Sequence, residues 1–201
     1  MSATFSIYNN TISNAIQIIE TSPVNNETTT IPENLNYTVT TGLELIGHFE
    51  LLKSWSLTAN ANIFNRDNAA APQFGISASN GISWNANITM NVTPLKRLSL
   101  QIHADYSAPN LYLQFQNRAE FGMDAAAKFD FAGNKASLSL NATDIFNSRN
   151  RAFLSVSDDV LLNFRRHQEG SRATLIFSWR FGWDSGASKH RKEEKRIEDA
   201  S

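Results

Sequence analysis

The chain has 201 residues, of which 41% are hydrophobic, a formal net charge of -1 and no cysteine. The near-zero charge gives no argument for a nucleic-acid partner, and the absence of cysteine excludes disulfide scaffolds, cysteine-ligated zinc and thiol catalysis. No run approaches the roughly 18 apolar residues of a membrane-spanning helix, and the opening "MSATFSIYNN" lacks the basic and apolar regions of a signal peptide.

Alternation of apolar and polar residues predicts about nine long strands along the chain. They are expected at 3–9, 13–22, 34–49, 54–65, 80–93, 96–107, 118–131, 134–148 and 170–181. Short connections are expected near Asn10 and at 52–53, 93–96 and 132–135, and long ones at 23–33, 66–79, 108–117 and 149–169. All five prolines fall in connections, as expected because proline has no N–H for a central strand. The predicted fold is an all-β antiparallel meander.

The strand at 96–107 shows the alternation most clearly. In "RLSLQIHADY" (97–106) the even positions are apolar and the odd positions polar. Successive side chains of a strand point to opposite faces, so this strand has one apolar and one polar face. The stretches "SWSLTANANI" (54–63), "ISWNANITMNV" (82–92) and "SRATLIFSWRF" (171–181) repeat the pattern.

Strand length separates two classes of all-β protein. Many of the predicted strands run to about twelve residues, which at roughly 3.3 Å per residue and a tilt near 40° project to about 30 Å. That covers the roughly 25 Å apolar band of a transmembrane barrel, whereas strands of soluble sandwiches average about five or six residues. We therefore expect part of a barrel in the outer membrane of a Gram-negative bacterium. The alternative is a soluble β-sandwich for adhesion or carbohydrate binding.

A barrel has lipid on its apolar face and a lumen on its polar face. The polar residues expected to face the lumen are Glu44, His48, His103, Asp105, Asp124 and Lys128. Aromatic residues near strand ends are expected to form girdles at the lipid headgroups. These are Trp55, Trp84, Tyr106, Phe131, Trp179 and Phe181.

The predicted strand number indicates a piece of a larger barrel. Nine is odd, whereas bacterial single-chain barrels close with an even number of strands, and an open edge leaves unpaired backbone groups in hydrocarbon. Together with the missing export signal, this predicts that residues 1–182 are the C-terminal part of a barrel. Residues 183–201 are expected to form a charged periplasmic tail.

Two long connections carry the side chains best suited to ligand contact. Aromatic rings and amides suit sugar rings or flat ligands, and arginines suit acidic groups. The candidates are Tyr112, Gln114, Phe115 and Gln116 in one connection and Arg165 and Arg166 in the other. Solvation of the rim is the alternative role for these residues.

Catalytic and metal chemistry have weaker support. His103 lies two residues from Asp105, and His48 lies between Glu44 and Glu50, so either set could ligate a cation. Ordinary lumen polarity is the favoured interpretation of these residues. No serine-histidine-aspartate order, zinc-protease motif or phosphate-binding glycine loop occurs. We expect no enzyme, no catalytic residue, no metal and no cofactor.

The C-terminal third resembles the end of TonB-dependent outer-membrane receptors of the Bacteroidetes type. The stretch "LSLNATDIFNSRNRAF" (138–153) is followed, after a polar segment, by "GSRATLIFSWRFG" (170–182). The residues that carry the motif are Asn141, Asp144, Phe146, Asn147 and the final aromatic Phe181. The resemblance extends over about residues 3–182.

This resemblance implies a 22-stranded barrel with an N-terminal plug, in which the long loops are extracellular. Such receptors import a bulky nutrient, such as a siderophore, glycan, vitamin or peptide. The implied partners are outer-membrane lipid, the remainder of the barrel and its plug, the TonB system through the plug, and an unknown nutrient ligand. Because plug and TonB-contacting segment are absent, the chain alone is not expected to transport.

Overall fold

The computed structural model describes residues 1–20, 29–112, 115–156, 161–167 and 170–181. These residues form two antiparallel β-sheets and one short 3-10 helix, η1 (Pro72–Phe74). Within them, no helix combines the length and apolar character needed to cross a membrane. The all-β prediction is confirmed. The predicted tail at 183–201 lies outside the described residues.

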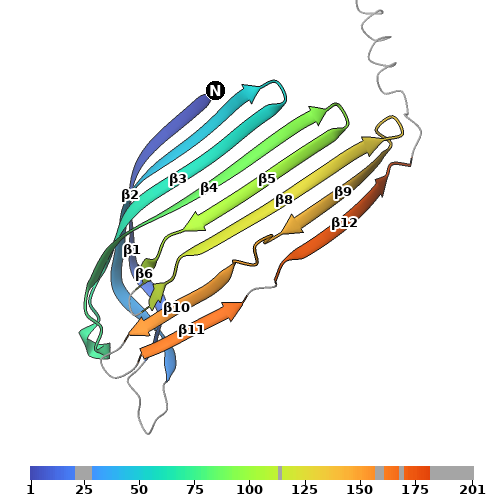
Figure 1. Cartoon of the computed structure of the whole chain (residues 1–201). Helices are drawn as coiled ribbons and strands as arrows, with labels where there is room; N and C mark the ends of the chain where they lie inside the picture. Colours follow the sequence, from blue (N-terminus) through green and yellow to red (C-terminus); the bar gives the residue numbers. More distant parts are fainter. Residues whose placement is uncertain (21–28, 113–114, 157–160, 168–169, 182–201) are drawn as a thin grey trace, which may run out of the picture.

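The main sheet is a meander of eight long strands in the order β1-β2-β3-β4-β5-β8-β9-β12 (Figure 1). Every neighbouring pair is antiparallel. The strands are β1 (Ser2–Glu20), β2 (Thr30–Leu52), β3 (Trp55–Asn68), β4 (Ser79–Leu95), β5 (Leu98–Ser107), β8 (Glu120–Phe131), β9 (Ala136–Thr143) and β12 (Arg172–Trp179). In the described residues the sheet stays open, with β1 and β12 at its edges.

The turn predicted at Asn10 is wrong. The expected strands at 3–9 and 13–22 are one strand, β1, whose register with β2 runs from Ser2 opposite His48 to Glu20 opposite Thr30. Asn10 pairs with Thr40, and the pairing continues on both sides of Asn14, from Ser13 opposite Tyr37 to Ala15 opposite Leu35, although the φ of Asn14 is positive at 53°. Asparagine pairs are local turn signals, but a partner strand of 23 residues continues the pairing past them.

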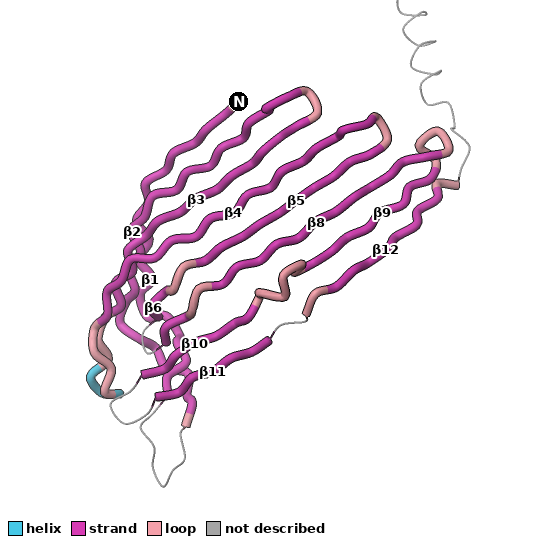
Figure 2. Tube along the Cα trace, viewed as in Figure 1, coloured by secondary structure: helices cyan, strands magenta, loops and turns pink. Residues whose placement is uncertain are grey.

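The second sheet arises from two connections that the sequence analysis leaves as loops. Its order is β11-β10-β7-β6, from β6 (Asn110–Tyr112), β7 (Phe115–Asn117), β10 (Asn150–Val156) and β11 (Leu161–His167). Phe153 of β10 stacks on Phe164 at 4.7 Å and meets Phe115 edge-on at 5.5 Å. Both views place this sheet at the opposite end of the main sheet from the short turns (Figure 1 and Figure 2).

The strand register gathers apolar side chains on one face of the main sheet. One row runs through Ile7, Leu43, Ile63 and Trp84 on β1 to β4, and another through Leu98, Phe129, Leu138 and Phe177. Trp84 is 45% exposed and Phe177 is 60% exposed. A sandwich would bury this face against a second sheet, whereas lipid covers it in a membrane barrel.

Aromatic residues of the apolar face form bands near both ends of the strands. At the short-turn end, Phe131, Phe177, Trp179 and Phe181 follow one another at centroid distances of 6.2–6.3 Å. At the other end, Trp84 lies 4.7 Å from Tyr106. Phe121 and Phe131 are the ends of one face of β8, and ten residues at roughly 3.3 Å each and a tilt of about 40° span about 25 Å. The two bands are therefore separated by the thickness of the apolar layer.

Candidate functional site

The six residues predicted to face a lumen share the polar face of the main sheet. On β2, Glu44 Oε1 accepts a hydrogen bond from Asn60 Nδ2 at 3.1 Å, and His48 Nδ1 lies 3.0 Å from Thr58 Oγ1. The register places Asp105, Asp124 and Lys128 on the same face, opposite Asn87, His103 and Ser99 respectively. This face carries polar residues on all eight strands, which is what a lumen wall requires.

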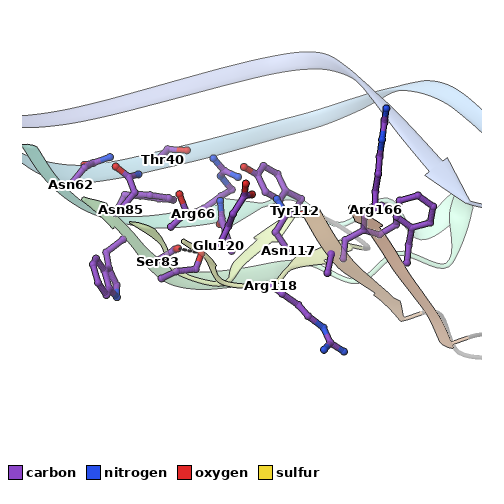
Figure 3. Close-up of a pocket in the computed structure, with 18 of the residues that line it drawn as sticks. Thr40, Asn62, Arg66, Ser83, Asn85, Tyr112, Asn117, Arg118, Glu120 and Arg166 are labelled. Atoms are coloured by element: carbon purple, nitrogen blue, oxygen red, sulfur yellow. Dashed lines mark hydrogen bonds between the residues drawn. The ribbon is translucent and has the colours of Figure 1, made fainter. Parts of the chain in front are cut away.

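A cavity of about 700 Å³ lies at the loop end of this polar face, between the main sheet and the second sheet. Figure 3 shows its lining. Main-sheet residues that line it include Tyr8, Asn62, Phe64, Arg66 and Asn85, and second-sheet residues include Tyr112, Asn117, Phe153, Phe164 and Arg166. A neighbouring cavity of about 370 Å³ shares Tyr8, Thr40, Arg66 and Tyr112 with it. The two hollows therefore meet at Arg66 and Tyr112.

Two contacts hold Ala108, in the connection that leads from β5 into the second sheet, against the loop end of β4. The N–H of Ala108 donates to the carbonyl of Trp84 at 2.9 Å, and Ser83 Oγ donates to the carbonyl of Ala108 at 3.4 Å. The N–H of Arg118 donates to the carbonyl of Ala152 at 2.9 Å and so extends the pairing of β7 with β10. The cavity thus has a roof of hydrogen-bonded strands instead of irregular loop.

Arg66 is the central cation of the cavity. Its guanidinium carbon lies 4.2 Å from the centre of the Tyr112 ring and 5.5 Å from that of Phe64, within the range of cation–π attraction. Its Nε and Nη1 are buried without a hydrogen-bond partner. Buried donors are nearly always satisfied, so these two N–H groups lack the partner that their burial calls for.

Arg149, in the segment between β9 and β10, has the opposite surroundings. Nη1 lies 2.7 Å from Asp124 Oδ1, and Nη2 lies 3.1 Å from Asp124 Oδ2 and 2.5 Å from Asp105 Oδ1. The hydrogen bonds to Asp124 first, and then to Asp105, hold the pKa of the Arg149 guanidinium above its ordinary value. The positive charge of Arg149 is therefore compensated by two carboxylates of the main sheet.

Glycines make room for two side chains of the polar face. A Cβ at Gly122 would overlap the Nε of Arg149, and a Cβ at Gly42 would overlap the ring of Tyr8. Tyr8 crosses Gly42 to donate from its hydroxyl to Asn62 Oδ1 at 3.2 Å. These two strand glycines permit a side chain to lie flat against the backbone.

The motif residue Asp144 shapes the bend between β9 and β10. The residue is buried, with 2% of its surface exposed, and its φ is 48°. Its carboxylate accepts the N–H of Ser148 at 2.9 Å and that of Arg149 at 3.2 Å. Its own N–H donates to Asp124 Oδ1 at 2.8 Å. Asp144 therefore fixes the chain so that Arg149 reaches the two carboxylates.

The other motif residues lie away from the cavity lining. Asn141 on β9 pairs with Ala126 and Thr174. The N–H of Asn147 donates to the carbonyl of Asp144 at 2.8 Å. Phe146 stacks on Phe121 at 6.2 Å, and Phe181 is 90% exposed beside Trp179. These residues shape the bend and the apolar face.

The structure places some of the predicted ligand-contact residues in the cavity lining and others outside it. Tyr112 and Arg166 line the cavity, whereas Phe115 packs on Phe153. Gln116 pairs with Leu111 and Leu154, Arg165 pairs with Ala152, and both side chains are exposed. Gln114 lies outside the described residues. Sequence reasoning missed Arg66 because it ended the strand at residue 65, whereas β3 continues to Asn68.

The metal alternative finds no cluster to support it among the residues that the structure describes. His103 Nε2 lies 3.7 Å from Asp105 Oδ1, but no group of three or more His, Asp or Glu side chains could hold an ion there. Asp105 is instead engaged by Arg149.

Comparison with known protein families gives a match over most of the chain. Residues 1–180 match the model of the outer membrane protein beta-barrel family. No curated protein and no solved structure matches the chain.

Proposed function

Because the chain belongs to the outer membrane protein beta-barrel family and lies in the outer membrane of a Gram-negative bacterium, we propose that it is part of a TonB-dependent receptor. In this role it supplies a section of the barrel wall and a section of the ligand-capturing mouth. The receptor takes up a bulky nutrient such as a siderophore, glycan, vitamin or peptide. The chain binds and guides this ligand without changing it chemically.

The observation that carries the proposal is the roofed cavity at the loop end of the polar face. Its volume of about 700 Å³ lies within the range of roughly 300–1,000 Å³ that small-molecule sites occupy. Its lining combines aromatic rings, amides and the guanidinium of Arg66, two of whose nitrogens have no hydrogen-bond partner. Such a site at the mouth of a barrel suits capture of a polar ligand before its passage.

The open edges of the main sheet support the further partners of the proposal. Each backbone group left unpaired in hydrocarbon costs several kcal/mol, and β1 and β12 each have one neighbour in the described sheet. In the proposal, the remainder of the barrel pairs with these edges and encloses a plug. The plug then connects the ligand site to the TonB system.

The test compares the native bacterium with a strain that lacks the gene. Both strains are given labelled ferric siderophores, a corrinoid, oligosaccharides and peptides in turn, with and without a protonophore. We expect the deletion strain to lose the energy-dependent uptake of one ligand class and to recover it on complementation. Equal uptake of every ligand class by the two strains would refute the receptor role.

A further inference from the structure

We infer that the roofed cavity recognises a carboxylated saccharide and that Arg66 is the residue that binds its carboxylate. The inference deepens the proposed function and rests on it for the route by which the ligand arrives. It depends on three features of the cavity. These are the unpaired N–H donors of Arg66, the single nearby carboxylate of Glu120, and the amides and aromatic rings in the rest of the lining.

The unpaired N–H donors of Arg66 call for a hydrogen-bond acceptor on the ligand. Arg66 Nε and Nη1 are buried without a partner, and among the described residues no aspartate or glutamate forms an ion pair with this side chain. Tyr112 and Phe64 lie within cation–π distance of the guanidinium carbon, and their rings offer these N–H groups no strong acceptor. An ionised carboxylate oxygen is a strong acceptor for a charged N–H donor.

The charge of the cavity favours a carboxylate over a phosphate. Figure 3 shows Arg118 and Arg166 extending away from Arg66, Tyr112 and Glu120, which lie together at the centre. Near the centre, one cation is thus accompanied by one acid, Glu120. A phosphate with nearly two negative charges would meet Glu120 with only Arg66 to compensate it. A monoanionic carboxylate needs a single guanidinium.

The remainder of the lining favours a saccharide as the carrier of that carboxylate. Asn62, Asn85 and Asn117 offer amides, and Ser83 and Ser107 offer hydroxyls, which together match the alternating donors and acceptors of sugar hydroxyl groups. Tyr8 and Tyr112 also line the cavity, and aromatic rings suit contact with the apolar faces of sugars. Glu120 can accept hydrogen bonds from ligand hydroxyls.

The experiment measures binding to outer-membrane vesicles that carry the full receptor. The probes are galacturonic acid, which carries one carboxylate, its methyl ester, and inorganic phosphate, and vesicles from the deletion strain are the blank. We expect the acid to bind and the ester to bind at least about 10-fold more weakly, because a charge-assisted hydrogen bond is lost. Equal binding of acid and ester, or binding of phosphate alone, would overturn the inference.

A variant series assigns the effect to Arg66. Arg66→Gln is expected to weaken binding of the acid about 10- to 100-fold and to leave binding of the ester nearly unchanged. Arg165→Gln, at an exposed arginine outside the cavity lining, is the matched control and should bind like the native protein. If Arg66→Gln reduces receptor abundance in the vesicles, Arg66→Lys replaces it, and this variant should bind the acid more weakly than the native protein.

Two results separate the inference from the proposed function. If the deletion strain loses uptake of a neutral nutrient and the vesicles ignore the acid, the receptor role stands and the inference fails. If the acid binds through Arg66 but energy-dependent uptake of every ligand is unchanged in the deletion strain, the inference stands and the receptor role fails.

Discussion

Two arginines at the loop end of the polar face differ in what their guanidinium groups touch. Arg149 meets Asp124 through two hydrogen bonds and Asp105 through a third. Arg66 lies against the rings of Tyr112 and Phe64, and two of its nitrogens have no partner. Both arginines join the main sheet to a segment beyond its loop end, but only Arg66 keeps donors without a protein partner.

The difference follows from the strands on which each arginine rests. The sheet around Arg149 is rich in charge, with Asp105 on β5 and Asp124 on β8 flanking Gly122, whose missing side chain admits the guanidinium. The residues opposite Arg66 in the sheet are Thr40 on β2 and Gly81 on β4, which carry no charge. An arginine beside two carboxylates becomes a structural clamp, whereas one with uncharged neighbours keeps unpaired donors.

The largest expected effect comes from breaking the bend that delivers Arg149. Asp144→Ala removes the acceptor for two backbone N–H groups and leaves an alanine at a positive φ. We expect the free energy of unfolding to fall by about 3 kcal/mol. Denaturant titration in detergent micelles measures it. Asp144→Asn keeps an acceptor and tolerates this φ, so it should lose clearly less; equal losses would disprove this role for the carboxylate.

Removal of the clamp itself ranks second. Arg149→Met leaves Asp105 and Asp124 facing each other, and because these groups are about one-third exposed we expect a loss of about 2 kcal/mol in the free energy of unfolding, below that of a fully buried pair. The same denaturant titration applies. In an Asp105→Asn, Asp124→Asn background, Arg149→Met should cost much less, because no uncompensated charge remains. An undiminished cost would show that packing, not charge, carries the effect.

The binding side of the comparison depends on the ring that holds Arg66. Tyr112→Ala removes the nearer cation–π partner, and we expect about 5-fold weaker binding of galacturonic acid to the vesicles. Tyr112→Phe keeps the ring and is the matched control, so it should bind within about 2-fold of the native protein. If the phenylalanine variant binds as weakly as the alanine one, the hydroxyl and not the ring is the contributing group.

The two faces of the main sheet could be predicted from the sequence because a strand has a period of two. One alternating stretch such as 97–106 determines the face of every residue in β5, and the register carries that assignment across the sheet. The turn at Asn10 failed for the opposite reason. It rested on a local preference, and the long pairing of β1 with β2 overrides that preference.

The site could be predicted only in part. Strands of three residues, such as β6 and β7, are too short to show a period, so the second sheet and the cavity beneath it were invisible. Arg149 is 25 residues from Asp124 and 44 from Asp105, and no local pattern reports pairing at that separation. Tyr112 and Arg166 were found because their chemistry is distinctive, whereas Arg66 was hidden by a strand end placed too early.

The smallest expected effect is at Lys128, and it tests the criterion that separates the two arginines. Lys128 Nζ lies 2.9 Å from Asp130 Oδ1, a distance close to that in the Arg149 clamp, but the lysine side chain is 46% exposed, against 19% for Arg149. Water and salt screen an exposed pair, so Lys128→Ala should change the free energy of unfolding by no more than about 0.5 kcal/mol in the same titration. A loss as large as that of Arg149→Met would mean that distance alone determines how much an ion pair stabilises the fold. A small loss would show that burial and the sharing of two carboxylates determine it.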